Sequence, residues 1–107
     1  MAEDIDGLRE WVREANEEAL YAEGFEAAIV GIAERCSEPA LVVYDADRCI
    51  EILIERDGMS WEEACEFFSV NVLGSWVGKH TPLFLRRFGQ EVMDDLAAVD
   101  LGEHSVG

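Results

Sequence analysis

Residues 41–68 read LVVYDADRCIEILIERDGMSWEEACEFF. The run begins with Leu-Val-Val-Tyr at residues 41–44, whose apolar and β-branched content is typical of a buried strand. Asp45 or Asp47 can cap a helix that follows over about residues 46–57, where apolar side chains recur at three- and four-residue spacing. The run therefore predicts a strand that leads directly into a helix.

A second helix is predicted immediately after the first. Gly58 can end the first helix, and Ser60 with Glu63 three residues later is a capping box. The second helix should run over about residues 61–77 and pair with the first as a helical hairpin. It should also be the central buried helix, because it presents a broad apolar stripe. The stripe consists of Trp61, Ala64, Cys65, Phe68, Val72 and Trp76.

The preceding part of the chain predicts a helix and two strands. An amphipathic helix is expected over about residues 6–22, because Leu8, Trp11, Val12, Ala15 and Ala19 recur at helical spacing among charged residues. Two apolar runs, residues 25–33 and 40–44, are separated by a polar segment and predict antiparallel strands.

The last quarter of the chain is ambiguous. Residues 82–85 can begin a helix or form an edge strand, since proline is tolerated at both places. One more helix is predicted over about residues 90–99, and the tail after about residue 101 should fray. The expected fold is therefore a single α+β domain over residues 1–107. A two- or three-stranded antiparallel sheet would pack on the helical hairpin, with a helix at each end of the chain.

The chain resembles a family of short uncharacterised proteins seen in bacteriophages and prophages. The resemblance covers about residues 23–85, and the family has no established activity, so it supplies no functional residues. It implies an extended conformation for residues 82–85. The segments that support it are Glu23-Gly-Phe-Glu-Ala-Ala-Ile-Val-Gly, Val43-Tyr-Asp, Cys49-Ile-Glu-Ile-Leu, Arg56-Asp-Gly-Met, Glu62-Glu-Ala, and Asn71-Val-Leu-Gly-Ser-Trp-Val-Gly with Thr81-Pro82.

The charge of the chain limits its partners. With 24 acidic against 8 basic residues among 107, the formal net charge is -16 at pH 7. Such a surface repels phosphate backbones and anionic lipids, so neither nucleic acid nor a membrane is an expected partner. It attracts basic surfaces, which in cells are most often nucleic-acid-binding proteins. The competing interpretation is that the acidity only keeps the protein soluble.

The cysteine pattern and the N-terminus predict a cytoplasmic protein, in this case inside a host cell. Cys36, Cys49 and Cys65 form neither a C-x-x-C pair nor an even disulfide set, which fits a reducing compartment. Cys49 and Cys65 fall at apolar helical positions and are expected to be buried thiols. The first residues are acidic where an export signal would be basic, and no apolar run is long enough for a membrane span.

No catalytic or metal motif is strong. Asp45-Ala-Asp47 resembles a D-x-D pair that could hold Mg²⁺, but helix capping is the better explanation. The serine of Gly74-Ser-Trp-Val-Gly78 follows the first glycine directly, so a nucleophile elbow is rejected. His80 and His104 lack zinc spacing. Asn71 is expected to be buried and to make a structural hydrogen bond. No cofactor is predicted.

Rows of carboxylates are the best candidates for a binding surface. Residues 1–34 hold ten acidic residues and two arginines, a net charge of -8, and further acids recur at helical spacing downstream. One row is sparser than the phosphates of DNA, so a mimic would need several rows on one face. The candidate partner-binding residues are Glu10, Glu14, Glu17, Glu18, Glu51, Glu55, Glu62, Glu63 and Glu66.

The predicted function is that of a small, non-enzymatic phage-type inhibitor. It would occlude a basic nucleic-acid-binding surface of a host protein, as DNA mimics of the anti-CRISPR or anti-restriction kind do. Two alternatives are kept. The protein could be a self-associating accessory protein, with a homodimer formed through the apolar end of the second hairpin helix. It could also be a small metal-dependent hydrolase that uses Asp45 and Asp47.

Overall fold

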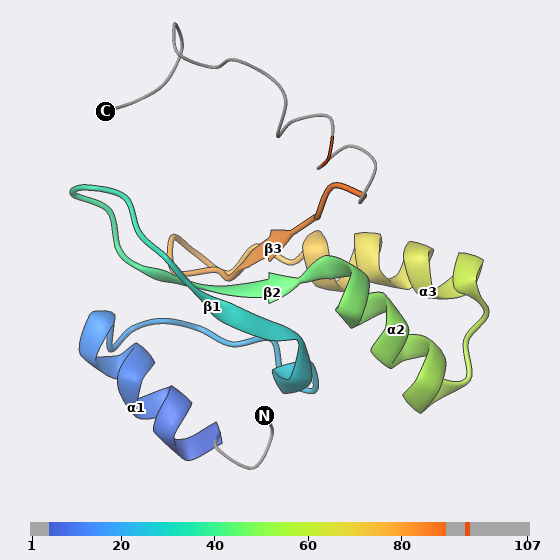
Figure 1. Ribbon diagram of the computed structural model, residues 1–107, viewed down its shortest axis with the longest axis horizontal. Coiled ribbons are helices and arrows are strands. Elements are labelled where there is room, and N and C mark those ends of the chain that lie inside the picture. The colour runs from blue at the N-terminus through green and yellow to red at the C-terminus, as the bar shows by residue number, and fades with distance from the viewer. Residues whose placement is uncertain (1–4, 90–93, 95–107) are drawn as a thin grey trace, which may run out of the picture.

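The computed structural model describes residues 5–89 and Asp94. It confirms the predicted α+β fold, in which a small sheet lies between α1 and the α2–α3 hairpin (Figure 1). The predicted C-terminal helix, residues 90–99, and the predicted frayed tail lie outside the described residues. The elements are α1 (Ile5–Ala15), the 3-10 helix η2 (Glu26–Ala28), β1 (Ile29–Ala33), β2 (Leu41–Asp45), α2 (Ala46–Asp57), α3 (Trp61–Phe67), the π-helix η3 (Phe68–Leu73) and β3 (Leu83–Leu85).

The sheet is mixed, whereas an antiparallel sheet was expected. β1 and β2 are antiparallel, with Ile32 opposite Val42, and β3 runs parallel to β2, with Phe84 opposite Tyr44. A parallel neighbour requires a crossover connection, and residues 46–82 supply it through the helical hairpin. Within residues 82–85, Leu83–Leu85 form strand β3, which agrees with the extended conformation that the resemblance implied. β3 lies at an edge of the sheet.

The core joins the sheet to the hairpin and extends to Val12 of α1 and Ala28 of η2, and α2 is its central helix. Cys49, Ile50 and Leu53 of α2 are fully buried together with Val42 and Tyr44 of β2. Two aromatic contacts extend this core to β3. The Phe84 ring stacks on Tyr44 at 5.5 Å between centroids and meets Phe68 edge-on at 5.4 Å. The prediction that the second hairpin helix would be the central one is wrong.

The second hairpin helix changes its geometry at Phe68 and is exposed over much of its length. There the α-helix passes into the π-helix η3, whose wider turn shifts the phase of the side chains that follow. Ala64 and Phe68 are buried, whereas Trp61 is 57% and Trp76 75% exposed. Helical structure also ends at Leu73, before the expected residue 77.

The first helix is shorter than predicted because Asn16 ends it. α1 stops at Ala15, and the Asn16 side-chain oxygen accepts the backbone N–H of Glu18 at 3.0 Å. Such local side-chain bonds compete with the helical pattern. The chain then follows the core, against which Ala19, Tyr21 and Ala22 pack. The predicted strand over residues 25–33 likewise begins only at Ile29, because a 3-10 turn precedes it.

The residues predicted to cap and end the hairpin helices are confirmed in these roles. Asp45 caps α2 by accepting from the backbone N–H groups of Asp47 and Arg48, and Gly58 ends it in a left-handed conformation with φ of 70°. Ser60 and Glu63 form the predicted capping box at the start of α3. These signals depend only on nearby residues, which is why the sequence shows them.

Within the described ranges, no helix is long and apolar enough to cross a bilayer.

Candidate functional site: acidic and apolar surfaces

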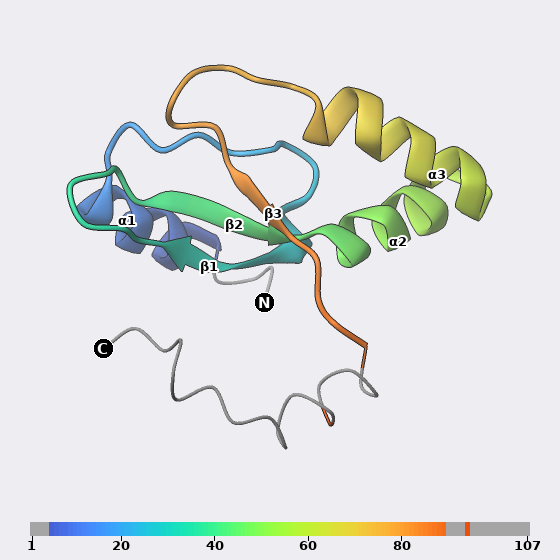
Figure 2. The same cartoon turned by 90° about the horizontal axis from the view of Figure 1, so that it is seen from above.

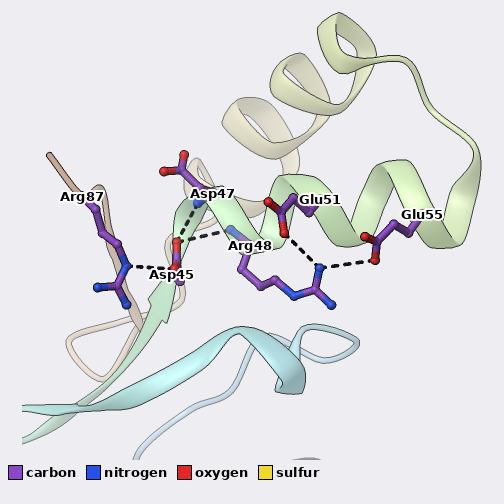
Figure 3. Close-up of polar contacts among 6 residues, drawn as sticks. All are labelled: Asp45, Asp47, Arg48, Glu51, Glu55 and Arg87. Atoms are coloured by element: carbon purple, nitrogen blue, oxygen red, sulfur yellow. Dashed lines mark hydrogen bonds and ion pairs between the residues drawn. The ribbon is translucent and has the colours of Figure 1, made fainter. Parts of the chain in front are cut away.

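Asp45 and Asp47 make contacts that hold the start of α2 and the segment after β3. One oxygen of Asp45 accepts from the N–H groups of Asp47 and Arg48, at 3.0 and 3.3 Å. The other lies 3.0 Å from Nε of Arg87, as Figure 3 shows. Asp47 approaches Arg86 at 3.9 Å. In the part of the chain that the structure describes, no three His, Cys, Asp or Glu side chains gather to hold a metal ion.

The environment of Asp45 stabilises its charged form. Partial burial alone would raise the pKa of this carboxyl. The hydrogen bond from Arg87, the backbone N–H groups of Arg48 and Asp47 and the positive charge of Arg87 outweigh burial, so the pKa lies below its ordinary value. Asp45 thus joins the start of α2 to the segment after β3.

Two of the candidate carboxylates are already partnered within α2. Glu51 and Glu55 both point toward the guanidinium of Arg48, whose Nη1 lies 3.0 and 3.3 Å from them (Figure 3). One positive charge is shared by two negative ones, so the cluster retains one net negative charge. This row is therefore a weaker candidate for binding a basic partner than its sequence spacing indicates.

The carboxylates near the N-terminus fall into two environments. Glu10 and Glu14 lie one helical turn apart on α1, whereas Glu17 and Glu18 lie in the turn after it. Glu18 is 3.4 Å from Nε2 of His80. Glu10, Glu14 and Glu17 are exposed and make no ion pair with any described residue. We call these three residues the N-terminal acidic surface.

A second acidic surface lies on α3 and includes apolar side chains. Glu63 is held by the capping box, whereas Glu62 and Glu66 are exposed and have no ion pair among the described residues. Beside them lies an open groove of about 450 Å³. We call it the α3 groove, and it is lined by Met59, Glu63, Glu66, Phe67, Val70 and Asn71.

The two acidic surfaces are far apart in the fold. In both Figure 1 and Figure 2, α1 lies at one end of the sheet and the α2–α3 hairpin at the other. The structure therefore does not bring all nine predicted carboxylates onto one face. It brings together Glu10 and Glu14 on α1, Glu51 and Glu55 on α2, and Glu63 and Glu66 at the groove.

Exposed apolar side chains on the second half of the hairpin were missed by the sequence argument. Val70 is 64%, Trp76 75% and Val77 62% exposed. Asn71 is exposed as well, so the expectation of a buried amide there is wrong. The apolar pattern of residues 68–77 indicated burial, but Phe68 alone in this run is fully buried, and Trp76 and Val77 lie after the end of η3.

The partly buried amide that does organise the fold is Asn16, which the sequence did not single out. Its Nδ2 donates to the carbonyl oxygen of Ala40 at 2.8 Å and lies 3.0 Å from Nδ1 of His80. These partners are 24 and 64 residues away, so no local pattern could indicate them. His104, the second histidine, lies outside the described residues.

The chain matches no protein-family model, no curated protein and no solved structure. The resemblance to phage proteins therefore stays a prediction. A function must be inferred from the charge, exposure and contacts of the described surfaces.

Proposed function

We propose that this protein is a small acidic binding protein of phage type that occludes a basic nucleic-acid-binding surface of a host protein. The observation that supports it best is the N-terminal acidic surface. Glu10, Glu14 and Glu17 are left without ion pairs among the described residues. Exposed carboxylates without ion pairs attract cationic surfaces over distances of about a Debye length.

The inhibitory step is competition for one surface. Glu10 and Glu14 are separated by one helical turn, a rise of about 6 Å. Arginine and lysine side chains that hold phosphates can pair with carboxylates at comparable spacing. A partner whose basic channel is covered in this way cannot bind DNA or RNA at the same time, so inhibition needs no catalytic residue.

The test compares two charge-matched triple variants. E10Q/E14Q/E17Q removes the unpaired carboxylates, whereas E18Q/E51Q/E55Q removes the same charge from carboxylates that already have partners. Tagged proteins are used for affinity capture from a bacterial lysate at low and high salt, and captured proteins are identified by mass spectrometry. The DNA binding of each captured protein is then measured with and without the acidic protein.

We expect a nucleic-acid-binding protein that is captured at low salt and weakened at high salt. E10Q/E14Q/E17Q should weaken its binding roughly tenfold and restore its DNA binding, because three exposed ion pairs are worth about 0.2–1 kcal/mol each. The control variant should change binding little. Equal losses in both variants would contradict a specific N-terminal surface, and the absence of any salt-sensitive partner would contradict the function.

A second function, self-association, is favoured by one observation. Trp76 and Val77 expose most of their side chains after the end of η3. An exposed apolar patch of this kind is typical of protein interfaces. If two copies meet through it, sedimentation should show a dimer that is insensitive to salt and that W76S abolishes. A monomer at all accessible concentrations would contradict this alternative.

A further inference from the structure

The α3 groove combines side chains from a turn and two consecutive helical segments. Met59 comes from the turn between the hairpin helices, Glu63, Glu66 and Phe67 from α3, and Val70 from η3. Within α3, Glu63, Glu66 and Phe67 follow the i, i+3, i+4 spacing of one helix side, and Val70 of η3 lines the same groove. The groove is thus a continuous strip along the hairpin, open to solvent.

The chemistry of this strip is amphipathic. Phe67 is 38% and Val70 64% exposed, although both are large apolar residues. Covering such surface removes apolar area from water, which is favourable. Met59 adds a flexible apolar side chain that adapts to different shapes. Glu63 and Glu66 line the same strip, so the groove combines apolar surface with negative charge.

These properties exclude two of the possible occupants. Nucleic acid would place phosphates beside Glu63 and Glu66 and would be repelled. A second copy that docked its own groove on this one would bring Glu63 and Glu66 of both copies into one interface, and the groove lining holds no Lys or Arg to offset them. A helix with apolar residues on one face and Lys or Arg beside them complements both parts of the groove.

We propose that the α3 groove binds a cationic amphipathic helix of the partner. This inference rests on the proposed function, because it requires a basic partner, and it specifies which element of that partner is held. The apolar face of the partner helix covers Phe67 and Val70, and its cationic side chains approach Glu66 and Glu63. The N-terminal acidic surface contributes attraction that salt screens, whereas the groove contributes contact that salt leaves largely intact.

The test uses two synthetic peptides of about four helical turns with identical Leu, Lys and Ala content. In one the leucines form a single face, and in the other the same residues are scrambled. Each peptide is titrated into the intact protein at low and high salt, with binding followed by calorimetry and by amide chemical shifts. Val70→Ser is compared with Val77→Ser, since the two valines are similarly exposed at 64% and 62%. Glu66→Gln is compared with Glu62→Gln, a neighbouring exposed acid outside the groove lining.

We expect the amphipathic peptide to bind at least about tenfold more tightly than the scrambled one and to shift amides around residues 63–70. V70S should weaken binding at least about threefold at both salt concentrations, and E66Q should weaken it mainly at low salt. The control variants should have little effect. Equal binding of the two peptides, or equal effects of V70S and V77S, would overturn the proposal.

Failure of this inference is distinguishable from failure of the proposed function. E10Q/E14Q/E17Q should leave peptide binding in the groove nearly unchanged at high salt. If the peptides fail to discriminate while lysate capture still depends on the N-terminal acidic surface, the groove proposal is wrong and the proposed function stands. If capture also fails, both are wrong.

Discussion

Nδ2 of Asn16 lies 3.0 Å from Nδ1 of His80, across 64 residues of sequence. The same nitrogen donates to the carbonyl oxygen of Ala40, and the amide oxygen accepts the N–H of Glu18. Two independent bonds therefore fix the orientation of the amide, so its nitrogen donates to the imidazole. One side chain joins the end of α1 to the residue before β2 and to the turn before β3.

Asn16→Ala should destabilise the fold by roughly 1–3 kcal/mol, because it leaves the Ala40 carbonyl and the His80 ring without their shared donor. A double-mutant cycle with His80→Ala should give a coupling energy of at least about 0.5 kcal/mol. Urea denaturation monitored by tryptophan fluorescence measures both quantities. Glu17→Gln is the control, since this exposed side chain makes no ion pair with a described residue. Strict additivity of the Asn16 and His80 changes would contradict the contact.

Tyr44→Phe should remove one hydrogen bond from the core without creating a cavity. The backbone N–H of Ala22 donates to the Tyr44 hydroxyl at 2.7 Å, and the Tyr44 ring is fully buried. Losing this acceptor leaves a partly buried N–H unpaired, at a cost of about 1–2 kcal/mol in the free energy of unfolding. Tyr21→Phe is the matched control. Equal losses for both tyrosines would argue against the Ala22 bond.

Alkaline titration should reveal the same buried phenol. Burial, opposed only in part by the hydrogen bond from Ala22, raises the pKa of Tyr44 to about 12. The unfolded chain releases this proton near pH 10, so the folded state holds more protons between those values and stability must fall as pH rises through them. The pKa of Tyr44 is measured from phenolate absorbance at increasing pH, by comparing wild type with Tyr44→Phe. Ionisation of Tyr44 near pH 10 in the folded protein would contradict its burial.

Asp45 should contribute stability that is lost in acid. Its pKa is lower when folded than when unfolded, so the contribution is present above the ordinary value of about 4 and disappears as pH falls through the lower folded value. At neutral pH, Asp45→Ala should cost about 1–2 kcal/mol, and Asp45→Asn less, because asparagine still caps a helix. Urea midpoints from neutral to strongly acidic pH measure the effect. A difference from wild type that persists unchanged at low pH would contradict the ionic origin.

The three cysteines should react at very different rates. Cys49 is fully buried, and burial, with the nearby charge of Asp45, raises the pKa of its thiol to about 12. Cys36 is exposed and Cys65 is partly buried. Because the thiolate is the reactive form, alkylation at neutral pH should modify Cys36 first and Cys49 only after unfolding. Peptide mass spectrometry assigns the sites, and rapid labelling of Cys49 in the native protein would contradict the core.

Sequence was a good guide wherever a signal was local. Asp45, Gly58 and the Ser60–Glu63 box each act within one helical turn, and each is found as predicted. The apolar runs likewise identified both strands of the β1–β2 pair. The direction of β3 could not be read in this way, because it depends on how residues 46–82 return the chain to the sheet.

The surfaces were harder to predict than the elements. From spacing alone, the Glu51–Glu55 row and the Glu10–Glu14 row look equivalent. In the structure, Arg48 forms ion pairs with both Glu51 and Glu55. The exposure of Val70, which lies in the π-helix, and of Trp76, which lies after it, was missed because the sequence gives no simple signal for the change of helical geometry at Phe68 or for the helix end at Leu73. Which carboxylates are available to a partner is therefore a property of tertiary structure.

The parallel pairing of β3 also sets an order in which the chain can fold. β1 and β2 are joined by a short connection, whereas β3 can join only after residues 46–82 have closed a much longer loop, which costs more chain entropy. With three residues at the sheet edge, β3 should be the last strand to form and the first to open, and its amides should exchange with solvent faster than those of the β1–β2 pair. Each opening would uncover Tyr44 and Phe68 beneath Phe84 while the rest of the sheet stays intact.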